Sequence, residues 1–196
     1  LFYTNNILRN TNHYKKIFET KFKFLKNYKF NVLISVHRRE NFGKPLKEIF
    51  TAINELSKYE DLQVIYCIHS NPNVVFSEKK YLKKNKNIIH VKPLDYINFV
   101  FLMSNVDFIM SDSGGIQEEA PSLGKPHLIL REFTERPEAV SSGSAILSKL
   151  NKSEIIKNFK RVYFDKALFA KMSKIRNLYG NGKASKIIIK KIFEKI

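Results

Sequence analysis

The chain has 196 residues, among them 35 Lys and Arg, 18 Asp and Glu, five His, one Cys and no Trp. This length suits one large or two small domains, and 43% apolar with 27% charged residues is the composition of a globular rather than a disordered protein. The single Cys67 excludes an internal disulfide, and no Cys and His residues have the spacing of a zinc site. We therefore expect no metal and no cofactor.

The sequence carries no signal that points to a membrane or to secretion. No apolar run approaches the roughly 20 residues that span a bilayer, and the opening LFYTNNILRN lacks the basic, apolar and small-residue regions of a signal peptide. We expect a cytoplasmic protein without membrane insertion. The chain starts at Leu1 rather than at Met, so we also expect a fragment.

The net charge of +17 raises the hypothesis of nucleic-acid binding, because clustered Lys and Arg neutralise phosphates. Arg is the residue that grips phosphates and base edges in a fork, yet 28 of the basic residues are Lys and only 7 are Arg. Residues 93–140 hold three basic and eight acidic side chains, which sum to −5, so the rest of the chain carries +22. We therefore expect a lysine-rich solvated exterior and no nucleic-acid partner.

Apolar periodicity divides the chain into alternating helices and strands. Ile17, Phe18, Phe22 and Leu25 recur at helical spacing with Lys between them, which predicts an amphipathic helix over residues 13–28. The β-rich run 31–36 predicts the first strand, which leads into a polar loop. The elements predicted after this loop are helix 45–59, strand 62–68, helix 74–84, strand 88–91, helix 96–104, strand 106–111, a short helix from 115 or 116, strand 127–130, a short helix 137–142, strand 145–147 and helices 153–159, 166–178 and 184–195.

Six short apolar strands that alternate with helices predict a parallel sheet covered on both faces. We expect an α/β, Rossmann-like, doubly wound domain over residues 31–196 with strand order 3-2-1-4-5-6, and a helix with an interdomain connection over residues 1–30. In that order the first and fourth strands are neighbours. The loops that follow them should then open into one crevice, with the loop after the fifth strand at its border.

The loop Ser-Asp-Ser-Gly-Gly-Ile-Gln-Glu-Glu, residues 111–119, is suited to binding an anion. Its two glycines let backbone approach a ligand, and the N–H groups at the start of the following helix favour a phosphate. The loop matches neither a dinucleotide fingerprint nor a Walker A sequence. A structural alternative is a tight turn capped by Ser113. Glu118 and Glu119 are expected in the first helical turn, where a carboxylate could serve the dipole or bind ribose hydroxyls.

Two further loops border this crevice. The loop of His37, Arg38, Arg39 and Glu40 supplies groups that match phosphate oxygens or move a proton, with an Arg39 to Glu40 ion pair as the structural alternative. Residues 131–138 are densely charged. Outside these loops, patterns favour a core role for Phe99 over ligand stacking, and an ordinary loop role for His69, farther from the switch point.

Together these loops resemble those of a known family. The segments SVHRRENFGKPL, IHSNPNV, SDSGGIQEEAPSLGKP, REFTERPEAV and NLYGNGKAS occur in the order found in the C-terminal domain of the non-hydrolysing UDP-N-acetylglucosamine 2-epimerases. The resemblance covers about residues 31–190. It implies the C-terminal half of a two-domain glycosyltransferase-B type protein, with a UDP-sugar in the cleft.

The resemblance also implies roles for individual residues. Phe99 and the backbone at Leu94 match contacts to the uracil end of the nucleotide, and Glu119 matches the ribose-binding carboxylate. The diphosphate-binding positions are Ser113, Gly114, Gly115, Arg136 and His37.

Two more positions and one further role follow from the same resemblance. His37 is the candidate catalytic residue of this chain, because the main acid and base carboxylates of the family lie in the N-terminal domain, which this chain lacks. Arg38 and His69 match positions of a second, regulatory UDP-GlcNAc in some bacterial members.

For the activity, the resemblance implies interconversion of UDP-GlcNAc and UDP-ManNAc through elimination of UDP to 2-acetamidoglucal and its re-addition, for surface polysaccharide precursors. Because C2 chemistry needs groups on both faces of the sugar, we expect this chain alone to be inactive. An N-terminal half encoded separately would be a partner, and the complete enzyme is expected to be a homodimer. The alternatives are the donor domain of a UDP-sugar glycosyltransferase and a non-catalytic UDP-binding remnant.

Overall fold

A computed structural model describes residues 11–176, 178–180 and 183–194. Its centre is one parallel sheet in the order β3-β2-β1-β4-β5-β6, which confirms the predicted strand order. The strands are β1 (Phe30–Ser35), β2 (Leu62–Cys67), β3 (Ile88–Val91), β4 (Phe108–Ser111), β5 (His127–Leu130) and β6 (Ala145–Ser148). Ser35 and Ser111 are register partners at the ends of β1 and β4, so the polar loops that follow them leave the sheet side by side.

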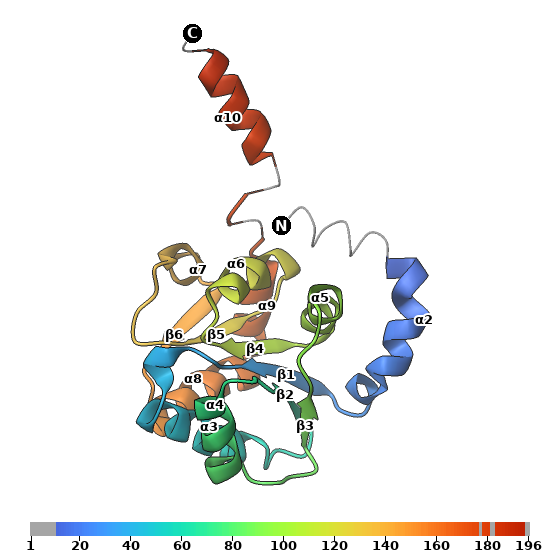
Figure 1. Cartoon of the computed structure of the whole chain (residues 1–196), viewed down its shortest axis with the longest axis vertical. Coiled ribbons are helices and arrows are strands. Elements are labelled where there is room, and N and C mark those ends of the chain that lie inside the picture. Colours follow the sequence, from blue (N-terminus) through green and yellow to red (C-terminus); the bar gives the residue numbers. More distant parts are fainter. Residues whose placement is uncertain (1–10, 177, 181–182, 195–196) are drawn as a thin grey trace.

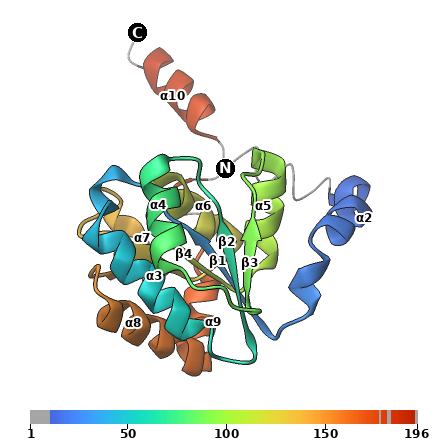
Figure 2. The ribbon, with the colours of Figure 1, turned by 60° about the horizontal axis from the view of Figure 1, so that its bottom comes forward.

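Helices cover both faces of this sheet (Figure 1; Figure 2). They are α2 (Thr11–Lys21), α3 (Lys44–Leu56), α4 (Pro72–Tyr81), α5 (Tyr96–Asn105), α6 (Gly114–Leu123), α7 (Pro137–Ser141), α8 (Lys152–Phe164), α9 (Lys166–Lys174) and α10 (Ala184–Phe193), with 3₁₀ turns η1 (Lys23–Lys26) and η2 (Arg39–Asn41). The predicted helix over 13–28 is thus two elements, α2 and η1. Phe18 and Phe22 from this segment both stack on Phe101 of α5, with ring centroids 4.3 and 5.7 Å apart.

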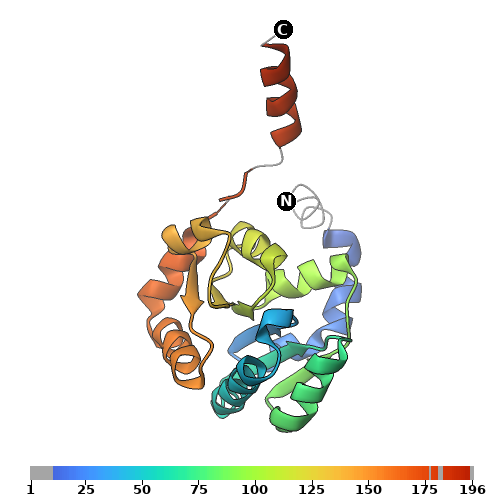
Figure 3. The same ribbon diagram turned by 60° about the vertical axis from the view of Figure 1, so that its left-hand side comes forward.

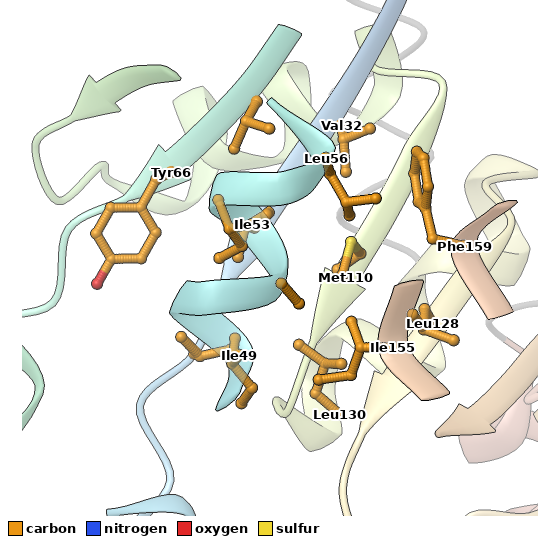
Figure 4. Packing of buried hydrophobic residues seen from close by; sticks show 14 of the residues in the cluster. Val32, Ile49, Ile53, Leu56, Tyr66, Met110, Leu128, Leu130, Ile155 and Phe159 are labelled. Atoms are coloured by element: carbon orange, nitrogen blue, oxygen red, sulfur yellow. The ribbon is translucent and has the colours of Figure 1, made fainter. Parts of the chain in front are cut away.

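Strand side chains alternate between two hydrophobic layers. Val32 and Met110 face α3 and α8, where Ile53 and Phe159 pack, as Figure 4 shows. The intervening Leu33 and Ile109 face the opposite layer, which α2, α5 and α6 complete. Both layers are buried because parallel strands with helices on each face present apolar side chains in both directions.

Helix α10 stands away from the rest of the molecule (Figure 1; Figure 3). In the part of the chain that the structure describes, no helix is both long and apolar enough to cross a membrane.

Candidate functional site

The carboxyl ends of β1 and β4 are tied together by one buried carboxylate. Asp112, which directly follows β4, is fully buried and accepts hydrogen bonds from the backbone N–H of His37 at 3.0 Å and of Arg38 at 2.9 Å. The side-chain amide of Asn41 donates to the same carboxylate at 2.9 Å and to the carbonyl of Leu130 at 3.1 Å. The ends of β1, β4 and β5 are therefore linked at the predicted crevice.

Helix α6 presents its N-terminus to this crevice. The helix starts at Gly114, one or two residues earlier than predicted, and Ser113 before it is in extended conformation. The Ser113 side chain makes no capping hydrogen bond, so the structural alternative of a turn capped by this residue is wrong. The first-turn N–H groups of a helix have no partner within the helix and attract anions. The first turn contains no acidic residue, so the expected placement of Glu118 and Glu119 there is also wrong.

Two arginines lie directly over this helix start. A Cβ on Gly114 would come within 2.9 Å of Nη1 of Arg136 and 3.3 Å of Nη2 of Arg38. A Cβ on Gly115 would meet only the Ser113 hydroxyl, at 3.9 Å. Gly114 is therefore the glycine whose missing side chain lets two guanidinium groups approach the α6 N-terminus.

The loop after β5 is held against α6 by polar contacts. The Thr134 hydroxyl donates a hydrogen bond to the Gln117 side-chain oxygen at 2.5 Å and accepts one from the backbone N–H of Arg136 at 3.1 Å. Nε of Arg136 donates to Glu118 at 2.5 Å, and this contact is the first cause of the raised pKa of Arg136. The loop therefore carries the Arg136 guanidinium onto the first turns of α6.

Carboxylates surround the arginines of the crevice. Glu135 pairs with Arg131 at 2.6 Å, with Arg136 at 2.7 Å and with Arg38 at 3.6 Å. Glu40 pairs with Arg131 at 3.0 Å and with Arg38 at 3.7 Å. The structural alternative, a pair of Glu40 with its neighbour Arg39, is absent from the described ion pairs. The sheet order instead brings Arg131, which follows β5, to Glu40.

Glu119 lies farther along α6, beside the start of α5. Its Oε1 accepts a hydrogen bond from the Tyr96 hydroxyl at 2.7 Å. Leu94 and Phe99, which flank this tyrosine in sequence, are partly buried against the layer around Phe101. Phe99 therefore packs against the core layer, as its spacing predicts, and it belongs to α5, the helix whose Tyr96 contacts Glu119 of α6.

The two candidate histidines form a stack. The rings of His37 and His69 lie 4.9 Å apart between centroids with an interplanar angle of 14°. His69 lies in the loop after β2, as expected, and the stack brings its ring to the His37 loop that follows β1. Burial lowers the pKa of His69, and the His37 ring lowers it further against the opposing effect of Asp112.

Sequence reasoning missed two residues that build this crevice. Asp112 is a fully buried carboxylate, and the Arg131 side chain is only 3% exposed. The position of Asp112 at the end of a buried strand is a signal that could have identified it. A buried carboxylate needs hydrogen-bond donors, and the loop after β1 offers them.

Comparison with known proteins relates this chain to one family. The family model described as "UDP-N-acetylglucosamine 2-epimerase" matches residues 3–193. The chain belongs to the UDP-N-acetylglucosamine 2-epimerase family. This result confirms the family resemblance expected from the sequence motifs.

Individual epimerases match nearly the whole chain. The UDP-N-acetylglucosamine 2-epimerase of Yersinia pestis is 41% identical over 191 residues, which cover 97% of this chain and 51% of that protein. The enzyme of Neisseria meningitidis is 43% identical, over 92% of this chain and 49% of its own length. The chain therefore spans about half the length of these curated epimerases.

Solved structures give the same result. The crystal structure of the Neisseria meningitidis UDP-GlcNAc 2-epimerase bound to UDP-GlcNAc matches with a TM-score of 0.89 and 42% identity, over 97% of this chain and 52% of that one. The C-terminal domain of a group 1 glycosyl transferase from Francisella tularensis, at 18% identity and a TM-score of 0.56, shares the fold alone. The predicted Rossmann-like fold of the glycosyltransferase-B type is confirmed.

Proposed function

We propose that this chain is the UDP-binding half of a UDP-N-acetylglucosamine 2-epimerase. The observation that carries the proposal is the approach of two guanidinium groups, from Arg38 and Arg136, to the N-terminus of α6 at Gly114. Guanidinium forks and free first-turn N–H groups are both strong partners of phosphate oxygens. Membership in the epimerase family and the UDP-GlcNAc bound to the Neisseria meningitidis relative support a UDP-sugar as the ligand.

In this proposal the nucleotide runs along α6. Ser113 and the N–H groups of Gly114 and Gly115 bind the diphosphate together with Arg136. Glu119 is five residues beyond Gly114, about 7.5 Å along the helix axis, and binds the ribose hydroxyls. The Tyr96 hydroxyl already holds the Glu119 carboxylate in place.

The base and the remaining phosphate contact complete the arrangement. Leu94 and Phe99 line the uracil end, because they are packed beside the α5 start next to Glu119. His37 lies at the diphosphate, where its ring can donate a hydrogen bond or move a proton. Arg38 and His69 also remain candidates for a second, regulatory UDP-GlcNAc. In this proposal that ligand lies beside the diphosphate, so Arg38 faces both, because both residues border the same crevice through Gly114 and His37.

The proposed reaction is epimerisation at C2 of the sugar. Removal of the C2 proton and loss of UDP give 2-acetamidoglucal, and UDP re-adds after reprotonation on the other face, which interconverts UDP-GlcNAc and UDP-ManNAc. The residues of this chain stabilise the charge that develops on the departing diphosphate. The products would serve surface polysaccharide synthesis in the cytoplasm, in a complete enzyme that is a homodimer.

The acid and base groups at C2 are proposed to come from an N-terminal domain of about the same size, encoded in the same or another chain. Glu118 and Glu119 are engaged by Arg136 and Tyr96 on the nucleotide side of the crevice. They are therefore unsuited to act on both faces of the sugar. The purified chain of 196 residues is expected to bind UDP without turning over UDP-GlcNAc.

Calorimetric titration with UDP and UMP tests the binding proposal. We expect UDP to bind more tightly than UMP, and Arg136→Ala to weaken UDP binding about tenfold through loss of charge-assisted hydrogen bonds. Arg161→Ala, on the exposed side of α8, removes the same charge away from the crevice and should leave the affinity unchanged. Equal affinities of all three proteins would contradict the proposal.

Turnover is measured separately by chromatography of UDP-GlcNAc incubated with the chain. Formation of UDP-ManNAc at a rate typical of an enzyme would contradict the proposed lack of activity. That result would not contradict the proposed UDP site.

A further inference from the structure

The Glu135 carboxylate pairs with three arginines of the crevice, Arg38, Arg131 and Arg136. Oε1 of Glu135 lies 2.7 Å from Nη1 of Arg136 and 3.6 Å from Nη2 of Arg38, and its Oε2 lies 2.6 Å from Nη1 of Arg131. The pKa of Glu135 is lowered, first by its own backbone N–H and then by Arg131 and Arg136. The carboxylate is therefore ionised at neutral pH and acts as an anion inside the crevice.

Glu135 holds the same guanidinium groups that face the α6 N-terminus. Nη1 of Arg136, which pairs with Glu135, is also the atom that a Cβ on Gly114 would meet at 2.9 Å. Nη2 of Arg38 shows the same double relationship, at 3.6 Å from Glu135 and 3.3 Å from the Gly114 position. An anion at the helix start would therefore compete with Glu135 for two arginines.

The pairing of Arg131 makes this exchange feasible. Arg131 is 3% exposed and keeps Glu40 as a second partner at 3.0 Å. Glu135 is 45% exposed, so its side chain has room to turn away from Arg38 and Arg136 while it stays on Arg131. Arg131 keeps its carboxylate partners during the exchange, so the exchange leaves no buried charge without a partner.

The charges of the cluster lead to the same conclusion. Three arginines, Arg38, Arg131 and Arg136, face three carboxylates, Glu40, Glu118 and Glu135, so the cluster is neutral. A diphosphate adds at least two negative charges. The cluster can accept them at low cost only if a carboxylate gives up its arginines.

We propose that Glu135 competes with the terminal phosphate of the nucleotide for Arg38 and Arg136. The Glu135 carboxylate holds these two arginines in the free protein and is displaced from them when a nucleoside diphosphate binds. This inference rests on the proposed function, because it takes Glu119 as the ribose end of the site. The phosphate next to the ribose then reaches the α6 N–H groups, and the terminal phosphate lies farther from Glu119, at the two arginines. Glu135 thus lowers the affinity for diphosphates more than for monophosphates.

The test compares Glu135→Gln with the wild-type chain in titrations with UDP, UMP and inorganic pyrophosphate. Loss of the competing charge is expected to tighten UDP and pyrophosphate binding about fivefold, the size of an ion pair between partly exposed side chains. UMP affinity should change by less than about twofold, because its one phosphate does not need the arginines. The gain should shrink at high salt, where exposed charges are screened.

Glu132→Gln is the matched control, because it removes the same charge from an exposed residue of the same loop that makes no ion pair among the described residues. It should leave all three affinities unchanged. Glu135→Asp keeps the charge and should bind UDP like the wild type. If the wild type binds UDP and Glu135→Gln binds it equally or more weakly, Glu135 only positions the arginines and the inference is wrong. If neither protein binds UDP, the proposed function fails as well.

Discussion

The buried carboxylate of Asp112 accepts the backbone N–H of His37, with 3.1 Å to Oδ1 and 3.0 Å to Oδ2. This contact joins the ends of β1 and β4 at the point where the nucleotide is proposed to bind. It makes the position of the His37 loop depend on one fully buried side chain.

Asp112→Asn should weaken both the fold and the site. The amide would turn an N–H₂ group toward backbone donors, which leaves buried donors unpaired and costs about 2–4 kcal/mol of unfolding free energy. UDP affinity should fall as well, because the loop of His37 and Arg38 loses its anchor. Urea unfolding and UDP titration measure the two effects.

Asp107→Asn is the control for this prediction. Asp107 accepts the backbone N–H of Asn31 at 2.7 Å, so it joins β4 to β1 at the opposite end of the strands. This variant should lose about 1 kcal/mol of stability and keep its UDP affinity. A similar loss of affinity in both variants would mean that Asp112 acts through general stability.

Gly114→Ala should reduce UDP binding without a loss of stability. The new Cβ would press on the ends of Arg136 and Arg38, at 2.9 and 3.3 Å, and these flexible side chains can move aside. Alanine also suits a helix better than glycine. We expect thermal stability at or above that of the wild type, with UDP binding about tenfold weaker because the guanidinium groups leave the α6 N-terminus.

A double-mutant cycle locates the cause of this effect. If the methyl group acts by displacing Arg136, Gly114→Ala should cost much less affinity in a chain that already carries Arg136→Ala. Additive losses would instead indicate that the methyl group blocks the ligand directly.

Acid sensitivity should depend on one buried histidine. His127 on β5 is fully buried, and neither ring nitrogen makes a hydrogen bond of ordinary geometry within the described chain. Burial lowers the pKa of His127 to about 3. Below the unfolded-state pKa of about 6.5 the unfolded chain binds a proton that the folded chain does not, so stability falls as pH falls toward 3.

His127→Leu should therefore flatten the stability profile between pH 6.5 and pH 4, by on the order of a few kcal/mol relative to the wild type. Stability at pH 7 should change by less than about 1.5 kcal/mol, because leucine is apolar and close in volume to the neutral imidazole. Denaturant unfolding at several pH values measures the profile. An unchanged slope in His127→Leu would contradict the prediction.

The sheet could be predicted from the sequence because each strand is a short apolar run between polar loops. Its order followed from alternation of strands with helices, and that order was enough to bring the loops after β1, β4 and β5 together. The start of α6 was harder, because it depends on the extended conformation of Ser113 rather than on residue type.

The contacts within the site could not be predicted in the same way. Glu40 pairs with Arg131, which is 91 residues away, rather than with Arg39 beside it, because the sheet decides which charges meet. His69 stacks on His37 for the same reason, since β2 and β1 are neighbours and their loops leave the same edge. Residue types in a loop indicate chemistry, but the pairs that form depend on strand order.

The apolar surface of α10 leads to a last prediction. Its large apolar side chains, which are 52–72% exposed, are Ile187, Ile188, Ile189, Ile192 and Phe193. A contiguous exposed patch of this kind promotes association, whereas single exposed apolar residues do not. The double variant Ile188→Lys and Ile192→Lys should keep the wild-type melting temperature, because both side chains are more than half exposed. In sedimentation at high concentration it should show a larger monomer fraction than the wild type. The variant Ile17→Lys and Phe164→Lys adds the same charge at two isolated exposed positions and should associate like the wild type. Equal sedimentation of the two variants would show that added charge, and not the α10 face, controls association.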